Sequence, residues 1–590
     1  MTMNEAKGKK TMEKELVNIT IDNQNISVPK GTTILEAAKK AGIDIPTLCF
    51  LKDINEIGDC RMCVVKVEGR RGLATSCIQK VEEGMVIKTH TPEIIEARHV
   101  MLDLIISNHD KDCLTCTRMG NCELQALASK FGIQSIEYKG ERKESEIDNL
   151  SPSIVKDPNK CILCRRCVAV CKNIQKIGAI DCGNRGFESS ISTSYNKSLK
   201  DTNCVYCGQC IEACPTSALR EKENIDEVWA KLKDPDVHVV VQTAPAVRVA
   251  LGEEFKMPIG TNVTGKMVTA LKRLGFDKVF DTNTGADFTI MEEANEFVER
   301  FKENDNIPMI TSCCPAWVRY IEINYPELIP HLSSCKSPHE MLGALIKTYY
   351  AKKEKIEPEK IFVVSVMPCI AKKYERQRKE LSNNGLSDVD CVITTRELSR
   401  MIKYANIRFE DLEDSEFDNP LGISTGAAAI FGTTGGVMEA ALRTAQDVLT
   451  GKDLDKIDFE QVRGEKGIKK ATVNIDGKDI KVVAASGLGN AQKIMEEIKS
   501  GKADYQFVEI MACPGGCIMG GGQPIKNSRT RAEHDVRKLR ADSIYSIDEK
   551  SQIRKSHENP ALKKVYEEYL EKPGSYRSEK LLHTTYGNNK

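Results

Sequence analysis

The alternation of apolar and polar residues predicts a strand-rich module at the start of the chain. In LVNITIDNQNISV, residues 16–28, Val17, Ile19 and Ile21 alternate with polar residues before a polar turn, which predicts a hairpin. Thr33 and Glu36 form a capping-box pattern that opens a short helix ending near Gly42. Two strands and a helix that lead into a cysteine loop indicate a small β-grasp-like module.

The rest of the chain shows a different pattern. Apolar residues at helical spacing predict a helix over about 94–108, and the polar stretch 141–160 is interpreted as a linker. From about residue 237, the apolar runs VHVVVQTAP, KIFVVSVMP, DCVITT and YQFVEIMA alternate with helical stretches, which predicts an α/β region with a buried, largely parallel sheet. Asp476-Gly477 predicts a hairpin within it, and residues 556–574 are expected to be helical.

Composition narrows the class of protein. The chain has 590 residues, with 85 Lys plus Arg against 85 Asp plus Glu, so its net charge of zero argues against nucleic acid or an anionic membrane as main partner. No apolar run approaches the length of a membrane span, and the charged first residues contain no signal-peptide core. We therefore expect a cytoplasmic protein, in which clustered cysteines among the 23 present indicate metal sites rather than disulfides.

Two cysteine groups lie in the first quarter of the chain. Cys49, Cys60, Cys63 and Cys77 could hold zinc or iron–sulfur, and the β-grasp context favours [2Fe–2S]. Cys113, Cys116 and Cys122 lack a nearby fourth cysteine, and His109 is the nearest candidate for the remaining ligand. This group predicts a [4Fe–4S] site with one histidine and three cysteines, with zinc as the weaker alternative.

The next group repeats a spacing typical of bacterial two-cluster ferredoxins. The first run is Cys161, Cys164, Cys167 and Cys171, and the second is Cys204, Cys207, Cys210 and Cys214, followed by Pro215. In this pattern the fourth cysteine of each run ligates the cluster of the other run. The sequence departs from it where Lys172 replaces a proline and where the segment between the runs is long. Four cluster sites in one chain indicate an electron wire, so we expect the chemistry in the C-terminal half.

Three motifs in that half carry the remaining cysteine pattern. They are TSCCPAW at 311–317, MPCIAKKYE at 367–375 and EIMACPGGCIMGGGQP at 509–524. Cys314, Cys369, Cys513 and Cys517 could hold another cubane, and the neighbouring glycines would let backbone approach a bulky ligand closely. A further electron-transfer cluster alone would leave Cys313 and the glycine-rich flanks unexplained.

These three motifs, in this order and after these accessory cluster sites, resemble the signatures of the [FeFe]-hydrogenases. From about residue 16 to 586 the chain resembles the monomeric, clostridial, ferredoxin-linked type. The resemblance implies an H-cluster, in which Cys314, Cys369, Cys513 and Cys517 hold a [4Fe–4S] cubane and Cys517 bridges to a di-iron unit with CO, cyanide and an aza-dithiolate. It implies that the pocket is formed by Pro245, Ala246, Met367, Pro368, Lys372, Phe431, Gly432 and Met511. Lys372 would donate to a cyanide, and Lys373 is expected to face solvent.

The resemblance also implies a proton relay through Cys313, Glu293, Ser333, Glu296 and Arg300. Glu293, Glu296 and Arg300 lie at i, i+3 and i+7 of a predicted helix, along one line. Without the resemblance, Glu296 and Arg300 would be interpreted as an exposed salt bridge. Three further cysteines, Cys182, Cys335 and Cys391, are expected to be small buried residues.

The expected fold class is therefore multidomain, α+β and α/β. The predicted parts are an extension (1–15), a β-grasp [2Fe–2S] module (16–93), a one-His/three-Cys [4Fe–4S] module (94–141), a two-[4Fe–4S] ferredoxin-like module (142–223) and a large α/β H-cluster domain (224–590). The cofactors implied are one [2Fe–2S], three accessory [4Fe–4S] clusters and the H-cluster.

The function implied is that of a ferredoxin hydrogenase, which oxidises H2 and reduces protons. Ferredoxin or flavodoxin would be the electron partner, and maturation enzymes would build the di-iron unit. No G-x-G-x-x-G stands between a strand and a helix, which argues against direct use of NAD. The alternatives are a respiratory-type NADH dehydrogenase large subunit, a non-catalytic iron–sulfur assembly protein and a sensory hydrogenase.

Overall fold

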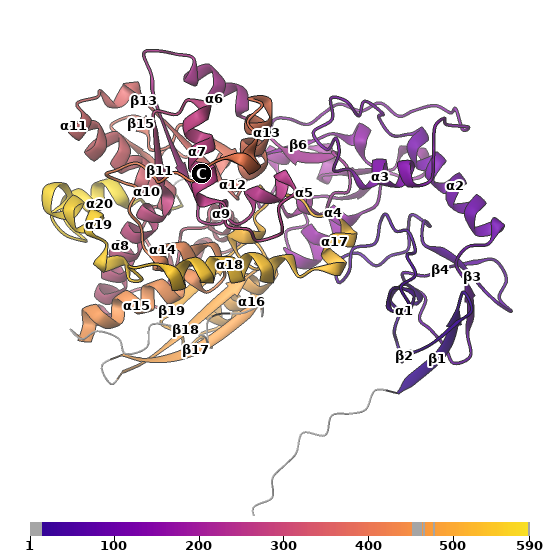
Figure 1. Cartoon of the computed structure of the whole chain (residues 1–590). Helices are drawn as coiled ribbons and strands as arrows, with labels where there is room; N and C mark the ends of the chain where they lie inside the picture. The colour runs from indigo at the N-terminus through magenta and orange to yellow at the C-terminus, as the bar shows by residue number, and fades with distance from the viewer. Residues whose placement is uncertain (1–14, 451–462, 464–466, 476–477, 588–590) are drawn as a thin grey trace, which may run out of the picture.

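The computed structural model describes residues 15–450, 463, 467–475 and 478–587. The N-terminal cluster modules lie at one end of the molecule and the large α/β part lies at the other (Figure 1). Among the described residues, the search for a helix long and apolar enough to cross a bilayer finds none.

The first module contains a five-stranded mixed sheet in the order β2-β1-β5-β3-β4. The predicted hairpin is confirmed, with Val17 opposite Val28, and so is the capping box of Thr33 and Glu36 at the start of α1. Ile19, Ile21 and the apolar face of α1 form its core, as their alternation requires. The elements are β1 (Leu16–Ile21), β2 (Gln24–Pro29), α1 (Ile34–Lys40), β3 (Val64–Val67), β4 (Leu73–Thr75) and β5 (Val86–Lys88).

The next two modules are small and built mostly from loops. Helix α2 (Pro92–Ser107) confirms the predicted helix, and α3 (Glu123–Lys130) follows the second cysteine group. The expected linker over 141–160 is wrong at its end, because Ile154 and Val155 are buried in β6 (Ile154–Lys156), which pairs with β9 (Leu219–Glu221) and closes the ferredoxin-like module. Between them lie α4 (Arg166–Ala169), β7 (Asp181–Gly183), β8 (Ser190–Ser192) and α5 (Gln209–Ala213).

Two four-stranded sheets form the large α/β part. The first has the order β11-β10-β13-β16 and is parallel throughout, and the second, β12-β19-β18-β17, is parallel except at β17. The apolar runs thus form strands as predicted, but in two sheets. The predicted turn at Asp476-Gly477 lies outside the described residues. The strands are β10 (His238–Thr243), β11 (Lys278–Asp281), β12 (Met309–Ile310), β13 (Ile361–Met367), β16 (Cys391–Thr394), β17 (Ile468–Ile475), β18 (Lys478–Ser486) and β19 (Phe507–Met511).

Helices cover both sheets and connect their strands. A small hairpin of β14 (Ser382–Asn383) and β15 (Leu386–Ser387) lies between β13 and β16. The helices are α6 (Ile225–Leu232), α7 (Thr264–Leu274), α8 (Thr282–Glu303), α9 (Pro315–Asn324), α10 (Pro338–Leu345), α11 (Ala351–Glu354), α12 (Ala371–Glu375), α13 (Thr395–Tyr404), α14 (Gly426–Ala429), α15 (Gly436–Thr450) and α16 (Leu488–Lys499).

The C-terminal segment runs along the molecule from the cluster modules to its far end (Figure 1). It comprises α17 (Ser528–Glu533), α18 (Val536–Lys550), α19 (Pro560–Val565) with a π-helical turn Tyr566–Leu570, and α20 (Tyr576–Leu582), so the helix expected within 556–574 is confirmed. Its tail pairs with the loop that precedes α10: the Lys336 amide donates to the Leu582 carbonyl (2.8 Å) and the Thr584 amide to the Ser334 carbonyl (2.8 Å). The C-terminal tail therefore lies near α8.

Candidate metal centres and active site

The first cysteine group comes together in two close pairs. The amide of Cys49 lies 3.3 Å from the Cys60 sulfur, the amide of Cys60 lies 3.4 Å from the Cys49 sulfur, and the Cys63 and Cys77 sulfurs are 3.3 Å apart. Within each pair, the hydrogen bond lowers the pKa of one thiol, Cys60 to about 6 and Cys63 to about 7, and raises the pKa of its partner, Cys49 or Cys77. Buried thiols with thiolate character are the donors that iron–sulfur clusters and zinc prefer.

The second group contains a buried histidine that could serve as a metal ligand. His109 is buried, and its Nδ1 atom has no hydrogen-bond partner among the described residues. Burial, followed by the nearby charge of Lys160, lowers the pKa of His109 to about 4, so the imidazole is neutral as a metal ligand must be. Burial is the main cause that raises the pKa of Cys122, and the neighbouring Cys116 adds to it. This donor set fits a metal cluster.

The two ferredoxin-like runs exchange their fourth cysteines. Burial is the main cause that raises the pKa values of Cys161, Cys164 and Cys167, and the nearby Cys214 adds to it in each case; these four cysteines line one cavity of about 30 Å³. Cys171 has the same effect on Cys204, Cys207 and Cys210. The arrangement is the one that the spacing predicts for two cubanes.

The fourth set of sulfurs meets between the two large sheets. Cys314 precedes α9, Cys369 follows β13, and Cys513 and Cys517 follow β19. Burial and then Cys314 raise the pKa of Cys369 to about 12, and Cys513 and Cys517 are also affected by Cys314 and Cys369. Four converging buried thiols again match the donor set of a cubane.

A cavity of about 80 Å³ lies beside these sulfurs. Cys313, Cys314, Cys369 and Cys517 line it, together with seven of the eight predicted pocket residues: Pro245, Ala246, Met367, Pro368, Lys372, Phe431 and Met511. The eighth, Gly432, lies against Ala246. Sequence reasoning missed His339 and Thr282, which also line the cavity and carry no motif that marks them.

Glycines bring the loops of this site into contact. A Cβ on Gly516 would lie 2.7 Å from the Thr434 amide nitrogen, and one on Gly520 would lie 2.2 Å from the Pro368 carbonyl oxygen. A Cβ on Gly521 would lie 2.6 Å from the Gly208 Cα, within the second ferredoxin-like run. The Cys513 sulfur is 3.9 Å from the carbonyl oxygen of Cys207, so this cysteine set and that of Cys207 are neighbours.

Of the two lysines of the second motif, Lys372 lies where it was expected and Lys373 does not. Lys372 borders the cavity and donates to the Glu375 carboxylate (2.8 Å) and to the Cys313 carbonyl (3.3 Å). Burial works to lower the pKa of Lys372, but Glu375 outweighs it and the pKa is raised. The expectation that Lys373 faces solvent is wrong: its side chain is 1% exposed and pairs with Glu397 at 2.9 Å. The short helix α12 is enclosed on both sides, so the ammonium groups of Lys372 and Lys373 are both buried. Each of them therefore needs a carboxylate as charge partner.

Three of the five expected relay residues, Ser333, Glu296 and Arg300, are joined by hydrogen bonds. The Ser333 hydroxyl donates to Glu296 (2.8 Å), and Arg300 donates to the other oxygen of Glu296 (2.7 Å). Glu293 is buried, and its carboxylate oxygens have no hydrogen-bond partner among the described residues. Burial, then Glu296, raises the pKa of Glu293 to about 8, and burial, then Glu293, raises the pKa of Cys313. The Glu296 and Arg300 side chains are only 13% and 16% exposed, unlike an ordinary surface ion pair.

The three cysteines left over differ among themselves. Cys335 and Cys391 are buried as predicted, whereas Cys182 is exposed and that prediction is wrong. Cys182 lies in β7, whose two-stranded hairpin with β8 is too small to cover its own side chains. Cys335 lies next to Glu296 and His583, an association that sequence reasoning also missed.

Comparison with known proteins agrees with this arrangement. The family described as "Iron only hydrogenase large subunit, C-terminal domain" matches residues 237–521. The family described as "Iron hydrogenase small subunit" matches residues 534–589. A 2Fe-2S iron-sulfur cluster binding domain matches 14–92, an NADH-ubiquinone oxidoreductase-G iron-sulfur binding region 98–137, and an NADH-quinone oxidoreductase subunit 3 ferredoxin-like domain 151–220.

Similar whole proteins extend the match to nearly the full chain. Iron hydrogenase 1 of Clostridium pasteurianum is 45% identical over 96% of this chain and 99% of its own length. The NADP-reducing hydrogenase subunit HndD of Solidesulfovibrio fructosivorans is 50% identical over 97% of this chain and 99% of its own length. An apo [FeFe]-hydrogenase structure from Chlamydomonas reinhardtii is 40% identical, with a TM-score of 0.55, over 62% of this chain and 99% of that one.

The fold and its cysteine sites thus define an iron–sulfur hydrogenase. The chain belongs to the [FeFe]-hydrogenase family, with the extended, clostridial-like set of accessory modules. The protein oxidises H2 and reduces protons, with [2Fe–2S] and [4Fe–4S] clusters and an H-cluster as cofactors.

Proposed function

We propose that this hydrogenase exchanges electrons with a ferredoxin or flavodoxin, one electron at a time, in the cytoplasm. The observation that carries this proposal is the unbroken series of cysteine sites from the N-terminal module to the cavity, because such a wire suits one-electron carriers. The relative that is named an NADP-reducing hydrogenase subunit supports a second candidate, in which another subunit binds the nucleotide and passes electrons to this chain.

The cofactors of this proposal follow the cysteine sets. They are one [2Fe–2S] cluster, three accessory [4Fe–4S] clusters, one of them with His109 as a ligand, and an H-cluster on Cys314, Cys369, Cys513 and Cys517. The di-iron part, with CO, cyanide and aza-dithiolate, would occupy the cavity of about 80 Å³. When bound, the H-cluster supplies the site at which H2 and two protons plus two electrons are interconverted.

The side chains around the cavity have three tasks. Met367, Phe431 and Met511 give the cavity an apolar wall that excludes water. Lys372, held by Glu375, presents a positive charge to an anionic group in the cavity. Cys313 accepts or releases the proton at the cavity and exchanges it with Glu293, which carries a proton near neutral pH because its pKa is about 8.

Proton transfer then continues outward. Ser333 has one hydroxyl proton, which it donates to Glu296 at 2.8 Å, and its oxygen can accept from a protonated Glu293. Arg300 holds Glu296 from the opposite side. The relay therefore ends at a carboxylate that is close to the surface.

Electron transfer has a corresponding route. The Asn55 side-chain amide donates both to the Cys49 carbonyl (2.8 Å) and to the Cys164 carbonyl (3.0 Å). Arg166 donates to the Cys49 carbonyl (3.3 Å) and pairs with Glu123 (2.8 Å), directly after Cys122. Both N-terminal modules thereby adjoin the Cys164 site, from which electrons pass through the ferredoxin-like module toward Cys513.

The test uses the holoenzyme matured anaerobically. Infrared bands of CO and cyanide should establish the di-iron unit, and metal analysis should find about 20 irons. Zinc at the His109 or Cys49 sets would contradict those assignments. Protein made without the maturation enzymes is the control, and it should keep cluster spectra but produce no H2.

The electron partner is tested separately with the same preparation. Reduced ferredoxin or flavodoxin should support H2 production by the isolated chain, whereas NADPH should not. Turnover with NADPH alone would refute the proposal, and turnover that requires an added nucleotide-binding subunit would favour the second candidate.

A further inference from the structure

The proposed relay ends at Glu296, and a titratable group in contact with that carboxylate would give protons a second outer route. Arg300 cannot serve, because a guanidinium keeps its proton at all accessible pH values. It donates to Glu296 and to the carbonyls of Pro330 and Leu332, so it fixes the carboxylate in place. A titratable group on another side of Glu296 would give protons a route that bypasses the arginine.

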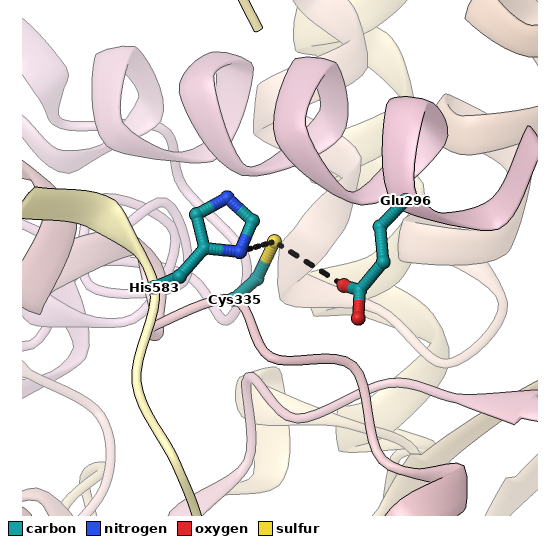
Figure 2. Close-up of side chains that lie close together, drawn as sticks. All are labelled: Glu296, Cys335 and His583. Carbon is teal, nitrogen blue, oxygen red and sulfur yellow. Dashed lines mark hydrogen bonds between the residues drawn. The ribbon is translucent and has the colours of Figure 1, made fainter. Parts of the chain in front are cut away.

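Such a group comes from the C-terminal tail (Figure 2). The Cys335 sulfur lies between Glu296 and His583, 3.9 Å from Oε2 of Glu296 and 4.0 Å from Nδ1 of His583. The Ser334 hydroxyl lies 2.8 Å from the same imidazole nitrogen. The pairing of the tail with residues 334–336 sets these distances, because Cys335 and His583 are opposite each other across an antiparallel bridge.

The second nitrogen of His583 is oriented by a buried carboxylate. Oε2 of Glu292 lies 3.1 Å from Nε2 of His583 and also accepts from the Gly574 amide (2.9 Å) and the Ser578 hydroxyl (3.1 Å). The Tyr566 hydroxyl donates to Oε1 of Glu292 (2.5 Å). An acceptor so placed fixes the imidazole as an Nε2–H donor and leaves Nδ1 to exchange a proton with the two groups that face it, the Ser334 hydroxyl and the Cys335 thiol, as in other carboxylate–imidazole pairs.

The remaining charges near this pair favour proton uptake. Glu292, Glu293, Glu296 and Tyr566 face the region as groups that can release protons, and Arg300 is the cation held against Glu296. Burial, followed by these three glutamates, raises the pKa of Cys335, so this residue remains a thiol that can donate its hydrogen. The His583 side chain is 13% exposed and can exchange protons with water.

We propose that Glu292 and His583 form a carboxylate–imidazole dyad that exchanges protons with Glu296 through the Cys335 thiol, as a second outer branch of the proton relay. In the inward direction, Nδ1–H of the imidazolium passes its proton to the sulfur while the S–H proton of Cys335 passes to the Glu296 carboxylate. The thiol is re-formed, the imidazole becomes neutral and takes its next proton from water, and no electron moves. The proposal rests on the proposed role of Glu296.

The test compares variants in the matured holoenzyme, with H2 turnover expressed per H-cluster from the infrared CO bands. His583→Gln and Cys335→Ala should each lower turnover by about threefold or more, with a larger solvent deuterium isotope effect and unchanged CO bands. Cys335→Ser should restore much of the rate, because a hydroxyl can pass protons, and imidazole should rescue His583→Ala. Cys391→Ala, which changes a buried thiol away from the relay, is the matched control and should have wild-type turnover.

A second measurement does not depend on turnover. The infrared S–H band of Cys335, identified by its loss in Cys335→Ala, should differ in frequency between the wild type and His583→Gln, because the imidazole lies beside this thiol. Wild-type turnover in both Cys335→Ala and His583→Gln, or an S–H band insensitive to His583, would overturn the dyad. Glu296→Gln separates the two hypotheses: if it loses activity while the dyad variants do not, only the branch fails, and if it keeps full activity, the relay itself fails.

Discussion

The buried carboxyl of Glu293 should reduce the stability of the protein while it serves the relay. Its side chain is 1% exposed, and its pKa is raised from 4.5 to about 8, first by burial and then by Glu296. In the unfolded chain the group ionises near 4.5, so above that pH the folded state must hold a proton that the unfolded state releases. The penalty is absent below pH 4.5, grows as the pH rises, and levels off above about pH 8 at about 5 kcal/mol, with about 3 kcal/mol at pH 7.

Glu293→Gln keeps the size of the side chain and cannot ionise. We therefore expect the variant to lose most H2 turnover and yet to unfold at a higher temperature than the wild type, with a difference that widens between about pH 5 and about pH 9. Thermal unfolding midpoints of the matured proteins, at one scan rate and both pH values, measure this. Glu299→Gln, an exposed position on the same helix, is the control and should show no widening. An equal shift at both pH values, or a variant less stable at the higher pH, would refute the reasoning.

Three further predictions concern single sites. His109→Ala should remove one cluster, about four irons, and leave the CO bands intact, as metal analysis and infrared spectra will show. Gly521→Ala should slow electron transfer between the Cys207 site and the cavity, because its Cβ would lie 2.6 Å from the Gly208 Cα and force the two loops apart; turnover with ferredoxin should fall while the infrared bands remain. Cys313→Ser and Cys313→Ala should lose most turnover per H-cluster and Cys313→Asp should recover part of it, and near wild-type turnover in Cys313→Ser would contradict the relay role.

The two ferredoxin-like cysteine runs were predictable because their spacing is local, whereas Cys314, Cys369, Cys513 and Cys517 are far apart in the sequence and were assigned through the resemblance. In a run such as Cys161 to Cys171, the short spacing keeps the sulfurs close together in space. The exchange of fourth cysteines follows from the repeat of this spacing. The assignment of individual ligands and relay residues stays a prediction, although the structure brings the expected side chains together.

Other features depend on contacts far apart in the sequence. Lys373 is buried only because α12 is enclosed and Glu397 supplies its charge partner, and a MPCIAKKYE motif does not show which lysine will be covered. Cys335 and His583 are 248 residues apart and meet through the C-terminal tail. Periodicity predicts the strands of the large domain. Their division between two sheets depends on contacts between distant loops, and no local sequence pattern predicts those contacts.

Arg166 has a consequence for attempts to shorten this enzyme. Its buried guanidinium is satisfied from outside its own module, by carbonyls of Cys49 and Phe50 and by the carboxylate of Glu123. A truncated enzyme that began at the ferredoxin-like module would lose all three acceptors and expose a cation beside the Cys164 site. Its new surface would attract acidic carriers and would hold the adjacent cluster at a more easily reduced potential, so a minimal version of the enzyme should be built with Arg166 replaced by a neutral residue.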